Sequence, residues 1–470
     1  MRLPAPFIKL PLRFDTARLK AEIGQFPEDE WRPHPQGFAG NSALILVSHQ
    51  GTENDDTQGS MTPAPRLERC PYLRQVMASF QTVIGRSRLM RLEPGAEVTP
   101  HTDIDYYWRD RIRIHVPLVT DPSVRFNCDG VEIHMGEGEA WIFDNWRPHY
   151  VINGSGIRRV HLVMDTVGSA AFWRLASSGV VTSASAQVAA RRVEHEPERR
   201  AELVFESHEP EAVSHPAAVK ATVHELVADI QSVPSRGPQQ AALAGTLLDF
   251  SNEWQALWAR FGAEPGHYAQ YAVLIEDTLR RAAPFGNGLR LPSNSTQVNV
   301  VLQRFLAGMF GGYREWSASL PVPDIRRPLI IVAAPRSGST LLFETLKRHP
   351  GLWTLGDESH AEIESVSGLA PRERGFASNV LGASDASPEV RVEVLRNFAL
   401  QLRDSGDERW LTRVGPLRSG LRLLEKTPKN ALRIPFLDAL FPDALFLFLH
   451  RAPGPNLGSM LDAWQSGRFV

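Results

Sequence analysis

Cysteine is scarce in this sequence, which contains only Cys70 and Cys128. Two cysteines are too few for a disulfide framework, and their separation matches no zinc-binding spacing. Such cysteine usage is typical of a reducing compartment, so we expect a cytoplasmic protein.

The sequence also lacks an excess of charge of one sign and any long apolar run. Its formal net charge is -2, and no block of Lys or Arg is present that would follow a nucleic-acid backbone. No stretch of about 18 apolar residues occurs, and the first residues do not resemble a charged leader followed by an apolar segment. We therefore expect neither nucleic acid nor a membrane as a partner.

What is present points to several domains, because 470 residues exceed what one hydrophobic core usually organises. Short alternating apolar segments between Leu89 and Asp165 predict consecutive strands of a sandwich or barrel. Helices are predicted over 16–24 and 72–79, and residues 1–80 would brace one face of this barrel.

The remainder of the chain changes character twice. Residues from about 176 to 216 are rich in Ala, Ser, Glu and Arg, which is typical of a linker. From 217 to 317 the apolar spacing is helical, which favours a spacer or a cap on the next domain over a separate catalytic unit. A buried strand over 329–334, a turn and an amphipathic helix then indicate an α/β domain, with another buried strand over 444–451.

A candidate iron site lies in the predicted barrel. His101 and Asp103 stand two positions apart in PHTDID, and His149 follows in RPHYVIN. Two imidazoles and one carboxylate can occupy one face of Fe(II) and leave three positions open. Because side chains two positions apart on a strand share one face, we expect His101 and Asp103 to point the same way.

The three open positions on Fe(II) can take 2-oxoglutarate and dioxygen. The distal carboxylate of 2-oxoglutarate would then need a buried cation. Arg159 lies on the strand after His149 and can point inward. Arg113 and His115 share one face of an earlier strand, RIRIHVPL, and offer a second cationic or hydrogen-bonding pair. Burying these residues in an apolar strand would be costly without an anionic partner, which favours a ligand site over ordinary salt bridges.

The segment RLMRLEPGAEVTPHTDIDYYWRDRIRIHVPLVTDPSVRF, followed by GEAWIFDNWRPHYVINGSGIRRVHLVMD, resembles the aspartyl/asparaginyl β-hydroxylase family. The resemblance implies a double-stranded β-helix of the jelly-roll or cupin type. It also implies His101, Asp103 and His149 as ligands of Fe(II), and Arg113, His115 and Arg159 as contacts of 2-oxoglutarate. Some members of that family lack the carboxylate ligand, whereas Asp103 is retained in this chain, which favours hydroxylation over halogenation.

A second motif follows the buried strand at 329–334. The loop APRSGSTLL opens a helix, so backbone N–H groups can cradle an anion there. It is not a Walker A loop, because GxxxxGK[ST] is absent, and a nucleoside triphosphatase is therefore disfavoured.

This loop, with LLEKTPKNALRIPFLDALFPDALFLFLHR and HRAPGPNLGSMLDAW, resembles the sulfotransferases that use 3'-phosphoadenylyl sulfate (PAPS). The resemblance implies that Arg336, Ser337, Gly338, Ser339 and Thr340 hold the 5'-phosphosulfate and that Arg451 and Ser459 hold the 3'-phosphate. In the GDESH segment, Glu358 is the expected general base, with His360 as the second candidate. Lys426 is expected to stabilise the bridging oxygen as the sulfuryl group leaves.

The sequence thus predicts a multidomain enzyme with a β-helix, a helical middle region and an α/β P-loop domain. The expected segments are a hydroxylase domain over 1–170, a linker over 171–216, a helical region over 217–325 and a sulfotransferase-like domain over 326–470. Similar sulfotransferases continue well past the DAWQSGRFV stretch, so we expect this last domain to be incomplete.

Three functions are compatible with these motifs. The favoured one is a hydroxylase whose second domain sulfates a hydroxyl group. The alternatives are a hydroxylase with a non-catalytic nucleotide-binding or scaffolding module, and a sensor of 2-oxoglutarate. The expected substrate is a small molecule, amino acid or peptide of the aspartyl/asparaginyl type, free or carrier-bound, admitted past His49 and Asn41.

Overall fold

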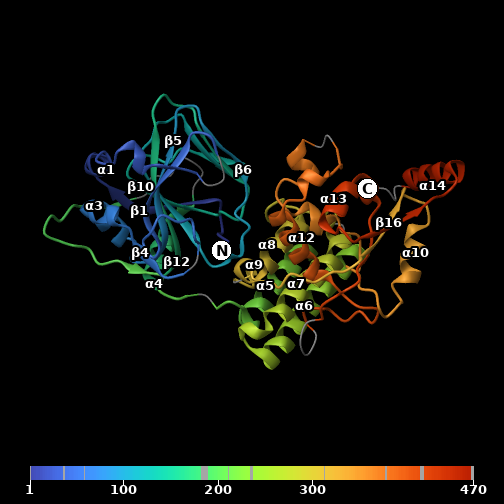
Figure 1. Cartoon of the computed structure of the whole chain (residues 1–470). Coiled ribbons are helices and arrows are strands. Elements are labelled where there is room, and N and C mark those ends of the chain that lie inside the picture. Colours follow the sequence, from blue (N-terminus) through green and yellow to red (C-terminus); the bar gives the residue numbers. More distant parts are fainter. Residues whose placement is uncertain are drawn as a thin grey trace. The chain divides into compact units, whose positions relative to one another are not determined.

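The computed structural model describes residues 2–34, 38–57, 59–181, 189–209, 211–232, 237–311, 313–375, 378–412 and 418–466. The chain forms two compact units (Figure 1). Unit 1 comprises 1–251 and 279–311, and unit 2 comprises 252–278 and 312–470.

Unit 1 is built on two antiparallel sheets. The main sheet has the order β13 (Val180–Val181), β1 (Phe7–Phe14), β10 (Glu139–Phe143), β7 (Ile112–Val119), β12 (Arg159–Gly168), β5 (Val83–Leu92), β3 (Asn41–His49) and β2 (Arg32–Pro33). The small sheet has the order β6 (Glu97–His101), β11 (His149–Asn153), β8 (Val124–Cys128) and β9 (Val131–Ile133). From β5 to β12 the chain passes back and forth between the two sheets, with β8 and β9 paired as neighbours in the small sheet. This is the topology of a double-stranded β-helix and confirms the predicted fold.

Apolar side chains explain why these strands pack. Strand β7 is buried along nearly its whole length, and Ile112, Ile114 and Val116 contribute to the main core. A second cluster, which includes Phe7, Phe126 and others from both sheets, fills the space between the sheets. The core therefore fixes the strand ends that carry the polar residues of the site.

Helices outside the barrel brace the main sheet, and the two helices that the sequence predicted, over 16–24 and 72–79, are among them. They are α1 (Thr16–Ile23), α2 (Pro65–Glu68), α3 (Pro71–Ala78) and α4 (Ala170–Ser177). Leu19 of α1 and Val76 of α3 join the same core as the strands of the main sheet. Asp15 caps α1 by accepting a hydrogen bond from the backbone N–H of Arg18. The sequence did not reveal β1 and β3, which extend this sheet.

The segment expected to be a linker, 171–216, is partly ordered against the barrel. It contains α4 and the short strands β13, β14 (Arg191–Val193) and β15 (Val204–Phe205). Strand β14 pairs with β1 and β15 pairs with β5, while β4 (Met61–Pro63) pairs with β3. Short strands of two or three residues give no periodic signal in a sequence, so this pairing was missed.

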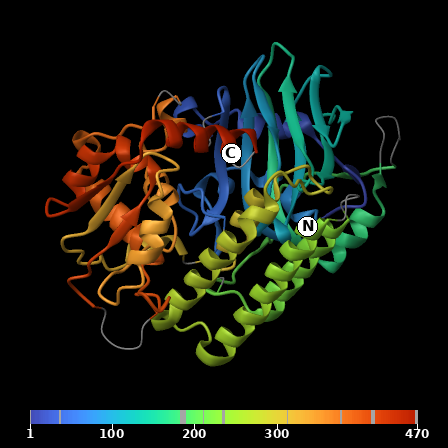
Figure 2. The same ribbon diagram turned by 90° about the vertical axis from the view of Figure 1, so that its right-hand side faces the viewer.

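The predicted helical region contains α5 (Pro216–Gln231), α6 (Pro238–Phe261), α7 (Tyr268–Gly286), α8 (Val298–Gly308) and α9 (Tyr313–Ala318) (Figure 2). The region is divided between the two units, because 217–251 and 279–311 belong to unit 1. Part of it is therefore packed with the barrel rather than with the following domain.

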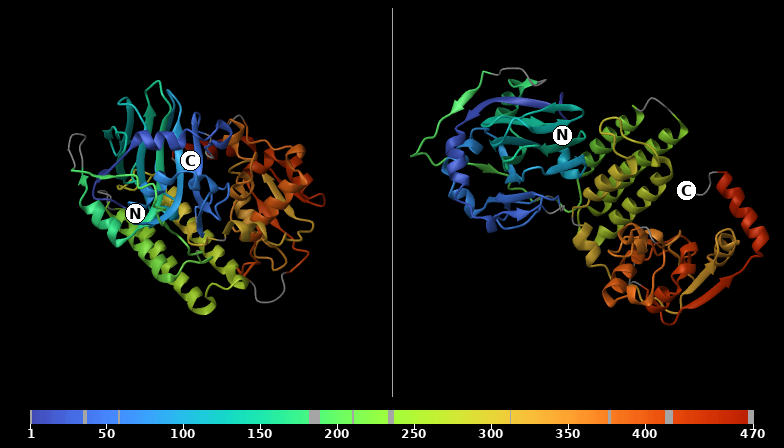
Figure 3. Two further views of the ribbon diagram at one scale, coloured as in Figure 1. Left: turned by 90° about the vertical axis from the view of Figure 1, so that its left-hand side faces the viewer. Right: turned by 90° about the horizontal axis from the view of Figure 1, so that it is seen from above.

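Unit 2 contains a parallel sheet in the order β17 (Leu424–Lys426), β16 (Leu329–Ala333) and β18 (Leu445–Leu449) (Figure 3). Its other helices are α10 (Ser339–Leu346), α11 (His360–Glu364), α12 (Pro388–Gln401), α13 (Ile434–Leu440) and α14 (Pro453–Gln465). The predicted strand, loop and helix over the phosphate motif are confirmed as β16, the loop after it and α10.

Six 3-10 helices complete the described structure: Glu28–Glu30, Tyr106–Arg109, Pro265–His267, Pro371–Arg374, Ala383–Asp385 and Pro428–Leu432. In the described part of the chain, no helix combines the length and apolar character needed to span a bilayer.

Candidate iron centre and phosphate-binding loop

The three predicted iron ligands come together in unit 1. One ligand atom from each of His101, Asp103 and His149 lies within 4.8 Å of the others. Strands β6 and β11 pair with His101 opposite His149, and their ring centroids are 4.2 Å apart. The spacing argument assumed that Asp103 lies on the same strand as His101. It does not, because β6 ends at His101. The turn after β6 presents it instead, held by a hydrogen bond from the N–H of Asp103 to the carbonyl of Asn145.

The hydrogen bonds of both imidazoles favour metal binding. Nδ1 of His101 lies 2.8 Å from the carbonyl of Thr99, and Nδ1 of His149 lies 2.8 Å from the carbonyl of Arg147. A carbonyl can only accept, so Nδ1 carries the proton in each ring and Nε2 keeps its lone pair. Burial lowers the pKa of His149 to about 4, which keeps this ring neutral at physiological pH.

One end of the pocket contains a buried cation. Arg159 is 5% exposed, and within the described residues no carboxylate pairs with it. Its Nη2 donates to Nδ1 of His161 at 2.7 Å, and its Nε has no hydrogen-bond partner there. Nε2 of His115 is likewise buried without a partner among the described residues. Burial lowers the pKa of Arg159 to about 9. A buried cation without a carboxylate partner is expected where an anionic ligand binds.

Arg113, the other predicted 2-oxoglutarate contact, already has acidic partners. Its Nε donates to Asp165 Oδ1 at 2.9 Å, and its Nη1 lies 3.6 Å from Asp103 Oδ2. Burial disfavours the charged guanidinium, but these two carboxylates keep the pKa of Arg113 above its ordinary value. Arg113 also stacks on Trp108, with 4.4 Å between Cζ and the ring centroid. It therefore connects the acid of the metal triad to a buried counter-ion.

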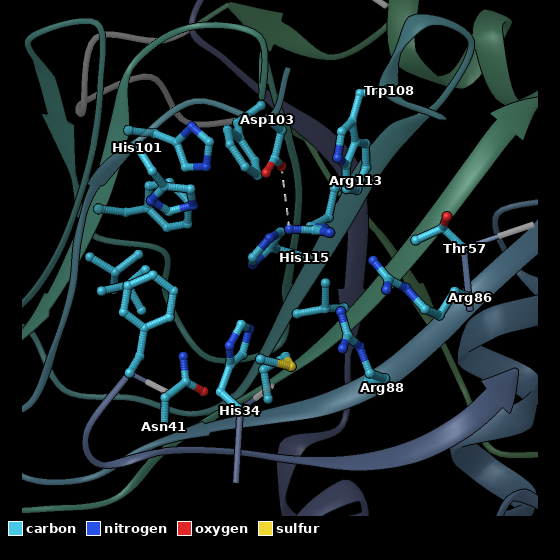
Figure 4. A pocket seen from close by; sticks show the side chains of 18 of the residues that line it. His34, Asn41, Thr57, Arg86, Arg88, His101, Asp103, Trp108, Arg113 and His115 are labelled. Atoms are coloured by element: carbon cyan, nitrogen blue, oxygen red, sulfur yellow. Dashed lines mark ion pairs between the residues drawn. The ribbon is translucent and has the colours of Figure 1, made fainter. Parts of the chain in front are cut away.

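Sequence reasoning missed a second cationic wall. Arg86 and Arg88 of β5 line the pocket with Arg113, across from His101 (Figure 4). Burial, together with the neighbouring charges of Arg86 and Arg113, lowers the pKa of Arg88 to about 9. The signal was available, since Arg alternates with small and apolar residues in GRSRLMRL as it does in RIRIHVPL.

The remaining lining differs in part from expectation. Asn41 lines the cavity, but His49 lies at the far end of β3, near Asp56 and Glu209. Trp108, Phe126 and Phe143 are among the aromatic residues that line the cavity, whereas the side chain of Trp146 donates a hydrogen bond to Ser293 outside it. The cavity of about 300 Å³ is sufficient for small molecules.

The phosphate-binding motif of unit 2 forms a loop between β16 and α10. Arg336 and Gly338 both adopt positive φ angles, 66° and 90°, which turn the backbone sharply before the helix. Ser339 is the first residue of α10, and Thr340 is the second. Ser337 accepts a hydrogen bond from Asn456 Nδ2 at 3.2 Å, so this loop is attached to α14.

The two predicted 3'-phosphate residues lie next to the same loop. Arg451 Nη1 donates to the carbonyl of Arg336 at 2.8 Å, and Arg336 Nε donates to Ser459 Oγ at 3.2 Å. All three side chains are accessible to a ligand, because these contacts are exposed. The residues assigned from two separate motifs therefore converge on one surface.

The predicted base and cation of unit 2 form an ion pair. Lys426 Nζ lies 2.5 Å from Glu358 Oε1 and 3.5 Å from Thr340 Oγ1. His360 Nε2 lies 2.9 Å from Glu358 Oε2. The hydrogen bond from His360 and the proximity of Lys426 hold the pKa of Glu358 at about 2, although partial burial opposes this shift. Glu358 is therefore a carboxylate, and it becomes a stronger base only when a ligand withdraws these donors.

A buried network behind this pair was missed. Glu425 is 3% exposed and accepts from Ser359 Oγ at 2.7 Å, and Asn430 also donates to it. Burial raises its pKa. The network ties β17 to the segment that carries Glu358 and His360, and no local spacing in the sequence indicates it.

Comparison with known proteins agrees with both motifs. Residues 56–168 match the model of the aspartyl/asparaginyl beta-hydroxylase family, and residues 328–468 match that of the sulfotransferase family. Both resemblances predicted from the sequence are thereby confirmed.

Individual relatives are remote. L-proline cis-4-hydroxylase of Rhizobium meliloti (strain 1021) is 26% identical over 162 residues, which cover 33% of this chain and 58% of that protein. A prolyl-4-hydroxylase of Pseudomonas putida covers 35% of this chain and 93% of its own, with 16% identity and a TM-score of 0.24. A 2OG-Fe(II) oxygenase family protein of Burkholderia pseudomallei covers 32% and 77%, with 15% identity and a TM-score of 0.23. The fold assignment therefore rests on the strand order.

Proposed function

We propose that unit 1 is an Fe(II)- and 2-oxoglutarate-dependent hydroxylase. The observation that carries this proposal is the His101, Asp103 and His149 triad beside a buried guanidinium that lacks an acidic partner among the described residues. Iron and 2-oxoglutarate, when bound, would supply the chemistry that uses dioxygen: one oxygen atom enters succinate as 2-oxoglutarate loses carbon dioxide, and the other enters the substrate as a hydroxyl group. The family match and the proline hydroxylase relative support the same class of reaction.

The residues of this chain have distinct tasks in the proposal. His101 and His149 present Nε2 to the metal, and Asp103 offers a carboxylate oxygen. Arg159 and His115 receive the distal carboxylate of 2-oxoglutarate, which satisfies polar atoms that otherwise stay buried without partners in the described structure. Arg113 orients Asp103 and supplies positive charge at the centre of the pocket.

We propose further that the substrate carries a carboxylate beside an amino group, as a free amino acid does. Arg86 and Arg88 offer a carboxylate site on β5, and Asp55 lies within 3.5 Å of Arg88. Asp55 is partly exposed and can accept from an ammonium group. The proline hydroxylase relative supports an amino-acid substrate.

The first experiment is an anaerobic titration of the full chain with Fe(II) and 2-oxoglutarate. The wild type is expected to show the weak visible band of the chelate and to form succinate once oxygen is admitted. His149→Ala is expected to show neither, and Asn54→Ala, outside the pocket, is the control. A well-folded wild type without band or succinate would contradict the proposal and favour a function carried by unit 2.

For unit 2 we propose PAPS binding at the loop after β16, with transfer to a hydroxyl group as its reaction. The convergence of Arg336, Arg451 and Ser459 supports binding, and the Glu358–Lys426 pair next to Thr340 supports transfer. The alternative is a nucleotide-binding or scaffolding module. Binding of adenosine 3',5'-bisphosphate without sulfation of any hydroxylated product would favour that alternative.

The fusion motivates a coupled reaction, in which unit 1 installs the hydroxyl group that unit 2 sulfates. Mass spectrometry of products formed with both co-substrates distinguishes coupled from independent activities. Hydroxylation and sulfation found only on separate molecules would contradict coupling.

Cys70 and Cys128 are both free, which supports the proposed cytoplasmic location.

A further inference from the structure

Part of the helical region contacts both loops that carry the candidate iron ligands. We propose that Ser293, Thr296 and Phe305 are positioning residues of the iron centre, which hold these two loops from outside the barrel. The inference rests on the proposed iron site. It assigns a role in the hydroxylase to a segment that its sequence pattern marks only as a spacer or cap.

The first contact reaches the turn between two ligands. Thr102 stands between His101 and Asp103, and its Oγ1 lies 3.0 Å from Oγ1 of Thr296. Both residues belong to unit 1, although 194 positions separate them in the sequence. A hydrogen bond at this position restrains the direction in which both flanking side chains leave the backbone.

The second contact reaches the loop before His149. Trp146 is 5% exposed, and its Nε1 donates to Ser293 Oγ at 2.9 Å. Ser293 in turn donates to Asp229 of α5, which also forms an ion pair with Arg2 at 2.9 Å. A continuous series of hydrogen bonds therefore runs from α5 to the loop that precedes β11.

Phe305 of α8 packs between the two loops. Its ring meets Trp146 edge-on at a centroid distance of 5.5 Å and Tyr106 edge-on at 6.1 Å. Gly308, one turn further along α8, approaches Tyr106 so closely that an added Cβ would lie 2.3 Å from the Cβ of Tyr106. The shape of this helix is thus matched to the loop that follows Asp103.

The turn that presents the two hydroxyl groups is itself well fixed. Leu291 N donates to the carbonyl of Thr296 at 2.9 Å, and Ser295 N donates to the carbonyl of Leu291 at 2.8 Å. Asn294 is 2% exposed and accepts from Thr296 N through Oδ1 at 2.9 Å. A turn closed by three internal hydrogen bonds can serve as a rigid support.

This support adds to the contacts that the ligand segments make within the barrel, where the N–H of Asp103 donates to the carbonyl of Asn145 at 3.1 Å. Asn145 Nδ2 lies 3.4 Å from Asp103 Oδ2, which is a long hydrogen bond. Ligands must be held within about 0.5 Å of productive geometry, and groups behind the ligands usually supply that restraint. Ser293, Thr296 and Phe305 occupy such places here.

The test is Co(II) titration of the oxygen-free full chain, because Co(II) absorption reports both affinity and coordination geometry. For the double variant Ser293→Ala, Thr296→Val we expect a dissociation constant about tenfold higher and altered visible bands. Thr296→Ser alone keeps the hydroxyl and is expected to bind as the wild type does. Val300→Ala, on an exposed position of α8, is the matched control.

Hydrogen exchange of the metal-free protein supplies a second measurement. Peptides covering 101–107 and 144–149 are expected to exchange faster in the double variant and in Gly308→Ala, with the barrel strands unchanged. Unchanged Co(II) affinity, bands and exchange in a folded double variant would overturn the inference while leaving the iron site intact. A wild type that binds no Co(II) would overturn the proposed iron site and this inference together.

Discussion

Arg113 and Asp165 form an ion pair inside the barrel, with 2.9 Å between Nε and Oδ1. Asp165 is 1% exposed, and Arg86 also approaches it, at 3.4 Å. Burial opposes ionisation of Asp165, but Arg113 and Arg86 hold its pKa below the ordinary value. Two arginines of the pocket are thus compensated, whereas Arg159 has no carboxylate partner among the described residues.

This difference predicts opposite effects of two similar substitutions. Arg159→Met removes an uncompensated buried charge, so the apo protein is expected to gain about 1 kcal/mol, or about 2 °C in melting temperature. The same change removes a charge-assisted contact to 2-oxoglutarate, and KM for this co-substrate is expected to rise about 10–100-fold. Differential scanning fluorimetry and succinate assays measure the two effects.

Arg113→Met is the matched comparison. It leaves the buried Asp165 without its nearest partner, so the melting temperature is expected to fall, by the equivalent of about 3–5 kcal/mol. A lower melting temperature in Arg159→Met, or an unchanged KM, would contradict the assignment of Arg159 as the 2-oxoglutarate contact.

Arg88 is predicted to select the substrate rather than the co-substrate. For Arg88→Met we expect unchanged 2-oxoglutarate binding, measured by the visible chelate band, and loss of the stimulation of succinate formation by an amino-acid substrate. Arg91→Met is the control on the same strand, since Arg91 pairs with Glu28 outside the pocket. Equal stimulation in Arg88→Met and Arg91→Met would argue against a carboxylate site on β5.

Much of unit 1 was predictable because its signals are local. The alternation of apolar residues in RIRIHVPL and RRVHLVMD predicts two strands. It also predicts that Arg113 and Arg159 lie on the inward-facing side of these strands. The pairing of β6 with β11, which brings His101 to His149, follows from the double-stranded β-helix topology that the resemblance implied rather than from any spacing. The placement of Asp103 beyond the end of β6 depends on Asn145, and a two-residue period does not reveal it.

The parts that escaped prediction depend on contacts between distant segments. The helical region is divided between the two units, and amphipathic spacing alone does not specify the unit with which a helix packs. Asp165 illustrates the same limit, because its role as the counter-ion of Arg113 appears only when β7 and β12 pair. In unit 2, the loop motif located the site, but the Glu425 network emerged only from the fold.

The buried imidazoles of unit 1 predict acid sensitivity. Burial lowers the pKa of His34 and of His149 to about 4, from an ordinary value of 6.5, and lowers the pKa of His115 and His161 as well. The unfolded chain therefore binds more protons than the folded protein between pH 4 and 6.5, so stability falls as the pH decreases through this window. For His149 alone, the loss reaches about 3 kcal/mol at pH 4.

Melting temperatures of the metal-free protein at several pH values measure this effect. His161→Gln keeps an acceptor for Arg159 but cannot take up a proton, so the decrease below pH 6.5 is expected to be shallower than in the wild type. The exposed His349→Gln should leave the profile unchanged. A decrease of the same steepness in His161→Gln would show that His161 does not contribute to it.

In unit 2, Arg451 and Lys426 are predicted to separate binding from transfer. Arg451 lies on the exposed surface next to Arg336, where it can reach a 3'-phosphate, and its loss removes one charge-assisted hydrogen bond. We expect Arg451→Ala to weaken adenosine 3',5'-bisphosphate binding about tenfold or more in calorimetry. Arg422→Ala, which removes an exposed arginine bonded to the carbonyl of Arg327, is the control.

Lys426→Ala is expected to act on transfer, because Lys426 is 8% exposed and contacts Glu358 and Thr340 rather than the surface that holds Arg451. Its loss removes a cation that holds the pKa of Glu358 near 2, so this pKa should rise, and the carboxylate should become a stronger base. Transfer of sulfate from PAPS to a hydroxylated product should nevertheless fall, because no cation then stabilises the leaving oxygen. Unchanged transfer in Lys426→Ala, with normal nucleotide binding, would show that Lys426 has no part in transfer. Nucleotide binding with no transfer in the wild type would identify unit 2 as a binding module.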